Sequence, residues 1–196
     1  MTDHTFELYS TKSYLPELKT SRSVIRSLQK AEIISLLEYY SVQDKYLLQY
    51  NHSDHAVRYT LEFLRNSLEL FKNIDIQLSG IYIKETYNPI TVIGFALRDM
   101  HGKNAALSCE IDQNYTNNYI LDEAFSSIFQ HIFQNLGFSC IDYLCPAGQI
   151  GKVRLLERIG MNYEYTIQQF VEDGQYHRVH RKYSLKRDDW MARNNL

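Results

Sequence analysis

Residues 117–138 read NNYILDEAFSSIFQHIFQNLGF, and residues 139–146 read SCIDYLCP. In the first segment apolar residues recur every three or four positions, which predicts an amphipathic helix that ends at Gly137. The second segment is a short apolar run of strand length, and another strand is expected before the helix, at residues 105–112. Strand, helix and strand in this order indicate a right-handed crossover between two parallel strands. The buried stripe of the helix is expected to comprise Leu121, Phe125, Ile128, Phe129, Ile132, Phe133 and Leu136.

The rest of the chain supplies elements on both sides of this unit. The patterns predict strands and helices in the following order: a strand at 21–27, helices at 29–40 and after Ser53-Asp54, strands at 76–84 and 90–98, a helix at 152–159, and a hairpin of strands 162–171 and 176–185 that turns at Asp173-Gly174. The buried face of the first helix is expected to comprise Ala31, Ile34, Leu37 and Tyr40. We expect one domain at residues 21–190, a loose N-terminal arm at 1–20 and a tail at 191–196.

Composition restricts the class of protein. The 196 residues are 44% hydrophobic and 22% charged, as in an ordinary globular domain. The formal net charge of −2 provides no basic field, so neither nucleic acid nor a membrane is expected as a partner. Three cysteines cannot complete a disulfide framework, and the N-terminus lacks an apolar signal segment, which together favour reduced thiols and a cytoplasmic location. The histidines lack partners at recognised ligand spacing, so no metal is expected.

The order of these elements and several short phrases resemble the GNAT-type N-acetyltransferases, closest to their RimJ/RimL-like branch. The phrases are RLLERIG at residues 154–160, the Asp-Gly turn, and YSL-R-x-x-W at residues 183–190. The resemblance implies an α/β (α+β) fold with a mixed central sheet of about seven strands. This sheet would splay between its fourth and fifth strands and carry helices on both faces. It also implies that acetyl-CoA, or another acyl-CoA, is the co-substrate.

The chain departs from this family where the co-substrate is held. In the family, small residues let backbone N–H groups and a helix N-terminus close on the CoA pyrophosphate. Here Thr116, Tyr119 and Leu121 stand at the Gln/Arg and small-residue positions. After the fifth strand, Gln149 could replace an amide that positions the thiol arm, and Lys152 could reach a phosphate. The resemblance thus implies a cofactor-binding set of Cys109, Ile111, Thr116, Asn117, Asn118, Tyr119, Gln149 and Lys152.

The candidate general base is Glu110, which shares one face of its expected strand with Ser108. Acyl transfer to an amine requires removal of an amine proton, which a carboxylate can accept directly or through water. A solvated carboxylate on the outer face of the strand is the alternative interpretation of Glu110. Tyr143 is expected to pack in the core, and Cys145 has no base beside it in the sequence that would make it a nucleophile.

Three functional hypotheses follow. The first is an N-acyltransferase that moves an acyl group directly from acyl-CoA to a primary amine of a small molecule or peptide N-terminus. The second is a GNAT-fold protein that has lost catalysis and serves as a binding or regulatory module. The third keeps the enzyme but takes the acyl group from a carrier protein. The tyrosine-rich, basic hairpin at residues 162–185 is the candidate contact for a homodimer, or one wall of the acceptor site.

Overall fold

The computed structural model describes residues 15–49, 76–84, 89–99, 103–111, 115, 118–170 and 177–195. Its strands are β1 (Leu18–Lys19), β2 (Ser23–Ser27), β3 (Ile76–Ile83), β4 (Pro89–Asp99), β5 (Asn104–Ile111), β6 (Cys140–Pro146), β7 (Asn162–Phe170) and β8 (His177–Lys186). Its helices are α1 (Lys30–Gln49), α3 (Tyr119–Gln130), α4 (Ile150–Arg158) and α5 (Arg187–Arg193). The helix predicted after Ser53 and the turn predicted at Asp173-Gly174 lie outside the described residues.

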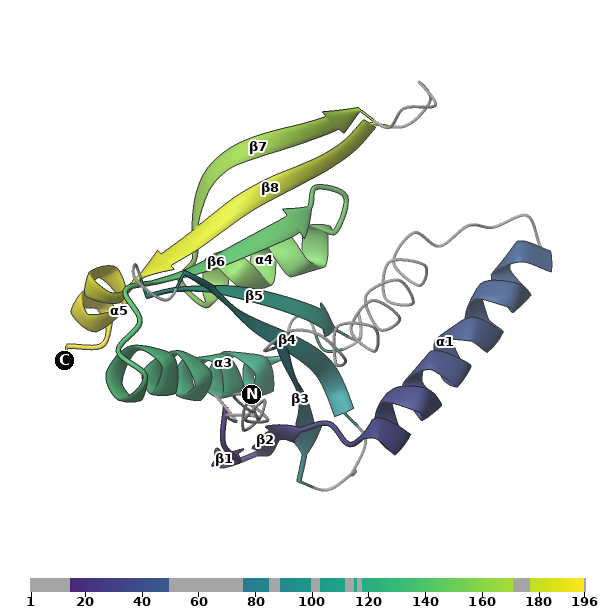
Figure 1. The fold of residues 1–196 in the computed structure, drawn as a ribbon, viewed down its shortest axis with the longest axis horizontal. Coiled ribbons are helices and arrows are strands. Elements are labelled where there is room, and N and C mark those ends of the chain that lie inside the picture. The colour runs from purple at the N-terminus through teal and green to yellow at the C-terminus, as the bar shows by residue number, and fades with distance from the viewer. Residues whose placement is uncertain are drawn as a thin grey trace, which may run out of the picture.

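The strands form one mixed sheet in the order β1-β2-β3-β4-β5-β6-β8-β7. Neighbouring strands run antiparallel except β5 and β6, which are parallel and joined through α3. The predicted crossover is therefore confirmed, and so is the pairing of the final hairpin, in which Phe170 lies opposite His177. Figure 1 shows α3 and α4 beside the middle of the sheet, and the β7–β8 hairpin at the top, at the opposite edge of the sheet from β1.

The α3 crossover forms because its apolar stripe is continuous. Every predicted stripe residue is buried except Leu136, which is partly buried. The helix continues into a π-helical turn at His131–Asn135, where the Leu136 N–H donates to the His131 carbonyl at 3.1 Å. The apolar spacing did not predict this turn. Gly137 then adopts a φ of 69°, the left-handed conformation that suits glycine at the end of a helix.

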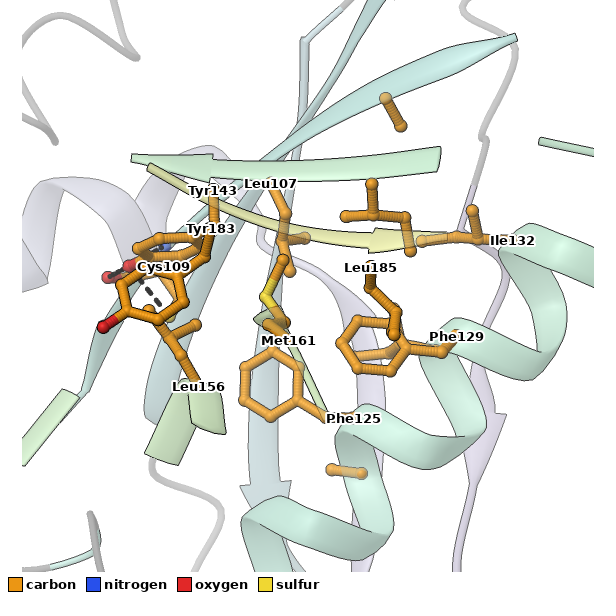
Figure 2. Packing of buried hydrophobic residues seen from close by; sticks show 14 of the residues in the cluster. Leu107, Cys109, Phe125, Phe129, Ile132, Tyr143, Leu156, Met161, Tyr183 and Leu185 are labelled. Atoms are coloured by element: carbon orange, nitrogen blue, oxygen red, sulfur yellow. Dashed lines mark hydrogen bonds between the residues drawn. The ribbon is translucent and has the colours of Figure 1, made fainter. Parts of the chain in front are cut away.

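Helices cover both faces of the sheet. On β3, Ile81 belongs to the core cluster that contains the α3 stripe, whereas Leu78 and Tyr82 pack with Ile33 of α1. Side chains an odd number of residues apart on a strand point to opposite faces, so α3 and α1 lie on opposite sides. Figure 2 shows residues of the larger cluster, with Phe125 and Phe129 of α3 near Leu156 of α4 and Leu185 of β8.

The prediction for α1 was partly wrong. Its buried contact is made by Ile33, with Leu36 and Leu37 partly buried, while Ile34 is exposed. Apolar residues at 33, 34, 36 and 37 permit two overlapping apolar stripes on the helix. The stripe through Ile33 is the buried one, because Ile33 packs against Leu28, Leu78 and Tyr82. The tertiary contact decides between them, and the helical period alone does not.

Both ends of the described chain are more ordered than a loose arm and a tail. Leu15 is buried in the main core and β1 pairs with β2, although residues 1–20 were expected as an arm. At the other end α5 extends to Arg193, whose guanidinium donates to the Gly160 carbonyl at 2.7 Å. Trp190 fills the space next to Phe133, with their ring centroids 5.6 Å apart.

Candidate functional site

The parallel strands β5 and β6 part from each other halfway along. Their pairing runs from Asn104 opposite Cys140 to Leu107 opposite Tyr143 and ends there. Beyond that point β5 continues to Ile111, still paired with β4, and β6 continues to Pro146, still paired with β8. The sheet therefore opens between two strands that each keep their other neighbour, as predicted for the fourth and fifth strands of the resembled fold.

The opened edge of β5 presents the backbone of Cys109. Its N–H donates to the Tyr143 hydroxyl at 3.3 Å, and its carbonyl accepts from the same hydroxyl at 3.1 Å. The carbonyl also accepts from the Lys152 ammonium at 2.8 Å. Figure 2 shows the Tyr143 ring next to Cys109, with dashed lines marking their hydrogen bonds. Side chains from β6 and α4 thus satisfy backbone groups that a neighbouring strand would otherwise satisfy.

Glu110 is buried and forms an ion pair with Lys152. The distance from the Lys152 Nζ to the Glu110 Oε1 is 3.2 Å, and the side chains are 6% and 7% exposed. The alternative of a solvated carboxylate on the outer face of the strand is therefore wrong. The sequence placed Glu110 on its strand, β5, but it contains no signal that a lysine 42 residues later would pair with it.

The neighbouring thiols and phenol stay protonated near neutral pH. Burial raises the pKa of the Cys109 thiol to about 11 and that of the Cys145 thiol to about 12. Burial also raises the pKa of the Tyr143 phenol well above its ordinary value. A thiol is nucleophilic only as a thiolate, so neither cysteine is placed to act as a nucleophile. Tyr143 is buried as expected, and it also contributes hydrogen bonds that simple packing would not require.

The N-terminus of α3 is capped by Asn118. The Asn118 side chain accepts from the Ile120 N–H at 3.0 Å, so it serves the helix itself rather than presenting a donor outward. Tyr119 is 72% exposed, whereas Leu121 is fully buried in the α3 stripe. Of the two large residues at the small-residue positions, Tyr119 therefore lies at the surface and Leu121 lies in the core. Thr116 and Asn117 lie outside the described residues.

Gln149 is the N-cap residue of α4 and follows the end of β6 after a short turn. Its side-chain oxygen is buried and has no hydrogen-bond partner among the described residues, and the side chain does not cap the helix. A buried amide oxygen normally has a partner, because leaving it unsatisfied costs about 1–3 kcal/mol. Ser108 and Ile111 are both partly buried on β5. Within the described ranges, the site therefore combines a buried ion pair, an opened strand edge and one unsatisfied amide.

Among the described residues, no group of three or more His, Cys, Asp or Glu side chains is arranged to hold a metal ion. No helix in that part of the chain is both long and apolar enough to cross a membrane.

No protein-family model and no curated protein sequence matches the chain. Solved structures match along most of its length. An acetyltransferase of the GNAT family from Bacillus anthracis has a TM-score of 0.63 and 17% identity, and the match covers 88% of this chain and 99% of that one. The ribosomal-protein-S5-alanine acetyltransferase from Vibrio fischeri has a TM-score of 0.62 and 14% identity, with 89% and 98% covered.

A third match contains the co-substrate class that the resemblance implies. It is RimL, a ribosomal L7/L12 alpha-N-protein acetyltransferase in complex with coenzyme A, with a TM-score of 0.62 and 13% identity. The match covers 87% of this chain and 98% of RimL. The expected likeness to RimJ/RimL-like proteins is thus found in the fold. The chain has the fold of the GNAT acetyltransferases.

Proposed function

We propose that the protein is an N-acyltransferase that moves an acetyl or other acyl group from acyl-CoA to a primary amine. The observation that carries the proposal is the parting of β5 and β6 beyond Leu107 and Tyr143. In open α/β sheets, ligands bind outside the carboxyl ends of parallel strands where the chain opens a crevice. The opened edge of β5 lies next to the buried carboxylate of Glu110 and to Lys152 in the first turn of α4.

The residues at the opening fit the arm of an acyl-CoA, provided that Tyr143 releases the Cys109 N–H and Lys152 releases the Cys109 carbonyl. An extended ligand with amide groups can bind an open strand edge as an additional strand would. The Cys109 carbonyl and N–H offer such an edge, and the unsatisfied Gln149 oxygen offers another acceptor. Because Tyr119 is exposed, it is free to turn away from a ligand at the α3 N-terminus.

The proposed mechanism is direct transfer with Glu110 as general base. The acyl-CoA supplies an acyl group activated as a thioester. Backbone N–H groups on the β5 edge at Cys109–Ile111 polarise the acyl carbonyl, since N–H groups two residues apart on a strand point the same way. Glu110 takes the amine proton directly, or through a water that the partly buried Ser108 hydroxyl helps to hold. The new C–N bond forms as the C–S bond breaks, and the thiolate leaves with a proton from solvent.

For the acceptor we propose only a chemical class, a primary amine. Two proteins with this fold are a ribosomal-protein N-terminal acetyltransferase and a spermidine N-acetyltransferase chimera. Both descriptions fit an amine as acceptor, so peptide N-termini and polyamines are the first candidates to supply.

We also propose the β7–β8 hairpin as the contact of a homodimer. On β7, an edge strand of the sheet, Tyr163 and Tyr165 are each 53% exposed. An exposed edge strand is a surface on which another chain can pair. Light scattering over a range of concentrations tests this: a dimer mass supports it, and a monomer at every concentration rejects it.

Release of free CoA thiol tests the proposed activity. The protein is mixed with acetyl-CoA and, one at a time, with peptides bearing free N-termini and with polyamines. We expect thiol release that depends on both protein and amine, together with a mass increase of one acetyl group on the amine. Absence of transfer to any amine, although acetyl-CoA binds, would favour the non-catalytic alternative.

One observation favours that second candidate, a binding or regulatory module with this fold. The chain's own Lys152 and Tyr143 already satisfy the β5 edge at Cys109. A fold that no longer takes up a co-substrate would keep such internal contacts permanently. An acyltransferase that uses a carrier-bound donor is a variant of the enzyme, and it would transfer from an acyl-carrier protein but not from acyl-CoA.

A further inference from the structure

The ammonium group of Lys152 occupies the binding position of any amide that enters the gap. It donates to the Cys109 carbonyl at 2.8 Å, at the point where β5 has lost its neighbour β6. A ligand arm lying along this edge would donate its own N–H to the same carbonyl. We propose that Lys152 is an internal competitor for the acyl-CoA arm and thereby sets the affinity of the site; the proposal rests on the function proposed above.

Burial of Lys152 shows that this contact is built into the fold. The side chain rises from the first turn of α4 and is only 6% exposed, whereas lysine is almost never fully buried unless it is paired. Its charge is matched by Glu110 at 3.2 Å and by the Cys109 carbonyl. The lysine therefore joins α4 to β5 across the opening, which no backbone pairing bridges beyond Leu107 and Tyr143.

A ligand that binds the β5 edge must exchange one hydrogen bond to the Cys109 carbonyl for another, and this exchange is unfavourable. It replaces a hydrogen bond from an ammonium with one from a neutral amide, and charge-assisted hydrogen bonds are the stronger of the two kinds. The ion pair with Glu110 need not break, because it uses a different acceptor atom. Removing the lysine side chain should therefore raise the affinity by about tenfold or more, the factor that one charge-assisted hydrogen bond is typically worth.

The direction in which the affinity for coenzyme A changes when Lys152 is removed distinguishes competition from electrostatic attraction. Coenzyme A carries several negative charges on its phosphates. Removal of a lysine from an anion-binding site normally weakens binding, because the attractive field falls. Competition predicts the opposite, tighter binding after loss of a positive charge.

Calorimetric titration with coenzyme A, which has no acyl group to transfer, measures the affinity without turnover. The proteins are the wild type, Lys152→Met, Glu110→Gln, and the double variant Lys152→Met with Glu110→Gln. The double variant is included because Lys152→Met alone leaves Glu110 buried without its partner and can impair folding. Lys182→Met is the matched control, since Lys182 is a partly buried lysine that is likewise paired with a carboxylate, that of Asp142 on β6. A thermal melt of each protein establishes that it is folded.

The comparison between Glu110→Gln and the double variant isolates Lys152. We expect the double variant to bind coenzyme A about tenfold more tightly than Glu110→Gln, with Lys182→Met equal to the wild type. Measurable wild-type binding that the loss of Lys152 leaves equal or weakens would overturn the competition and leave the proposed function standing. Absence of binding by every folded variant would reject both the competition and the proposed function.

Discussion

Cys109 is the residue of the candidate site that side chains from both β6 and α4 contact. Its carbonyl accepts from β6 through Tyr143 and from α4 through Lys152, while its side chain is buried with those of the core. A strand residue whose two backbone groups are held by side chains marks the place where the sheet has opened. Glu110 follows it directly, so the opened edge and the candidate base belong to adjacent residues of one strand.

At the residue scale, Glu110→Gln should reduce acyl transfer by about two to four orders of magnitude, the usual contribution of a general base. Glutamine keeps the shape and can still accept from Lys152, so folding should persist. The measurement is the rate of CoA thiol release at saturating acetyl-CoA and amine. Glu157→Gln, which removes an exposed carboxylate on α4, is the control and should retain full activity. A Glu110→Gln protein of undiminished rate would exclude Glu110 as the base.

A second prediction at this scale concerns the thiols. Because burial raises the pKa of Cys109 to about 11, only about one molecule in a thousand carries its thiolate at pH 8. The Cys145 thiolate, with a pKa of about 12, is rarer still. Titration of the folded protein with a chromogenic disulfide should therefore modify Cys140, which is partly buried, well before the other two. Rapid modification of all three without denaturant would show that the gap exposes Cys109.

At the scale of elements, α1 is anchored at its first turn by charge. Arg26 of β2 donates to both carboxylate oxygens of Glu32, at 3.0 and 2.8 Å, and lies over the Tyr82 ring of β3. The Tyr82 hydroxyl donates to Glu32 at 2.9 Å. The hydrogen bond from Arg26 is the largest cause that lowers the pKa of Glu32, from 4.5 to about 2. The helix is thus held to the sheet by a group that titrates in acid.

This anchor should make stability depend on pH in a defined direction. A lowered carboxylate pKa stabilises the fold fully above about pH 4.5, and the stabilisation is lost as pH falls toward 2. Between pH 6 and pH 3, the stability advantage of the wild type over Glu32→Gln should shrink by about 1–2 kcal/mol, less any solvent screening of a side chain that is 28% exposed. Urea unfolding of both proteins at the two pH values measures it. An advantage that stays constant would show that Glu32 is not held by Arg26 in solution.

The turn after α4 gives a second element-scale prediction. Gly160 has a φ of 99°, and a Cβ atom added there would collide with the Arg193 guanidinium of α5. Gly160→Ala should therefore lower the free energy of unfolding by about 1–2 kcal/mol. Gly148→Ala is the control, because nothing lies within 4 Å of its added Cβ. Equal urea midpoints for the two variants would contradict the α4–α5 contact.

At the scale of the whole molecule, the sequence predicted the topology well because its periodic segments are long. The apolar stripe of α3 has seven residues, and turn signals flank the final hairpin. Together they were compatible with one arrangement of the crossover and the hairpin, which is the arrangement found in the sheet. The sequence predicted less about the two ends, where Leu15 and α5 join the core through contacts between distant segments. Short apolar runs with two possible faces, such as residues 33–37, were likewise decided by tertiary packing.

The sequence predicted which residues belong to the candidate site, but it did not predict how their side chains contact one another. Alternation and the resemblance brought Glu110, Cys109 and Lys152 into one set, and the structure places these three together. That Lys152 would point inward at a carbonyl rather than outward at a phosphate depends on where the pairing of β5 and β6 ends. The end of this pairing is a property of the assembled sheet, and no local pattern encodes it.

A crystal structure of the protein with coenzyme A is the most direct test of the proposed site. We expect an extended arm between β5 and β6 beyond Leu107 and Tyr143, hydrogen-bonded to Cys109, with the Lys152 ammonium displaced from the Cys109 carbonyl. Coenzyme A bound at another place, or a crystal soaked to saturation in which Lys152 still bonds Cys109 and the gap holds no arm, would contradict this expectation.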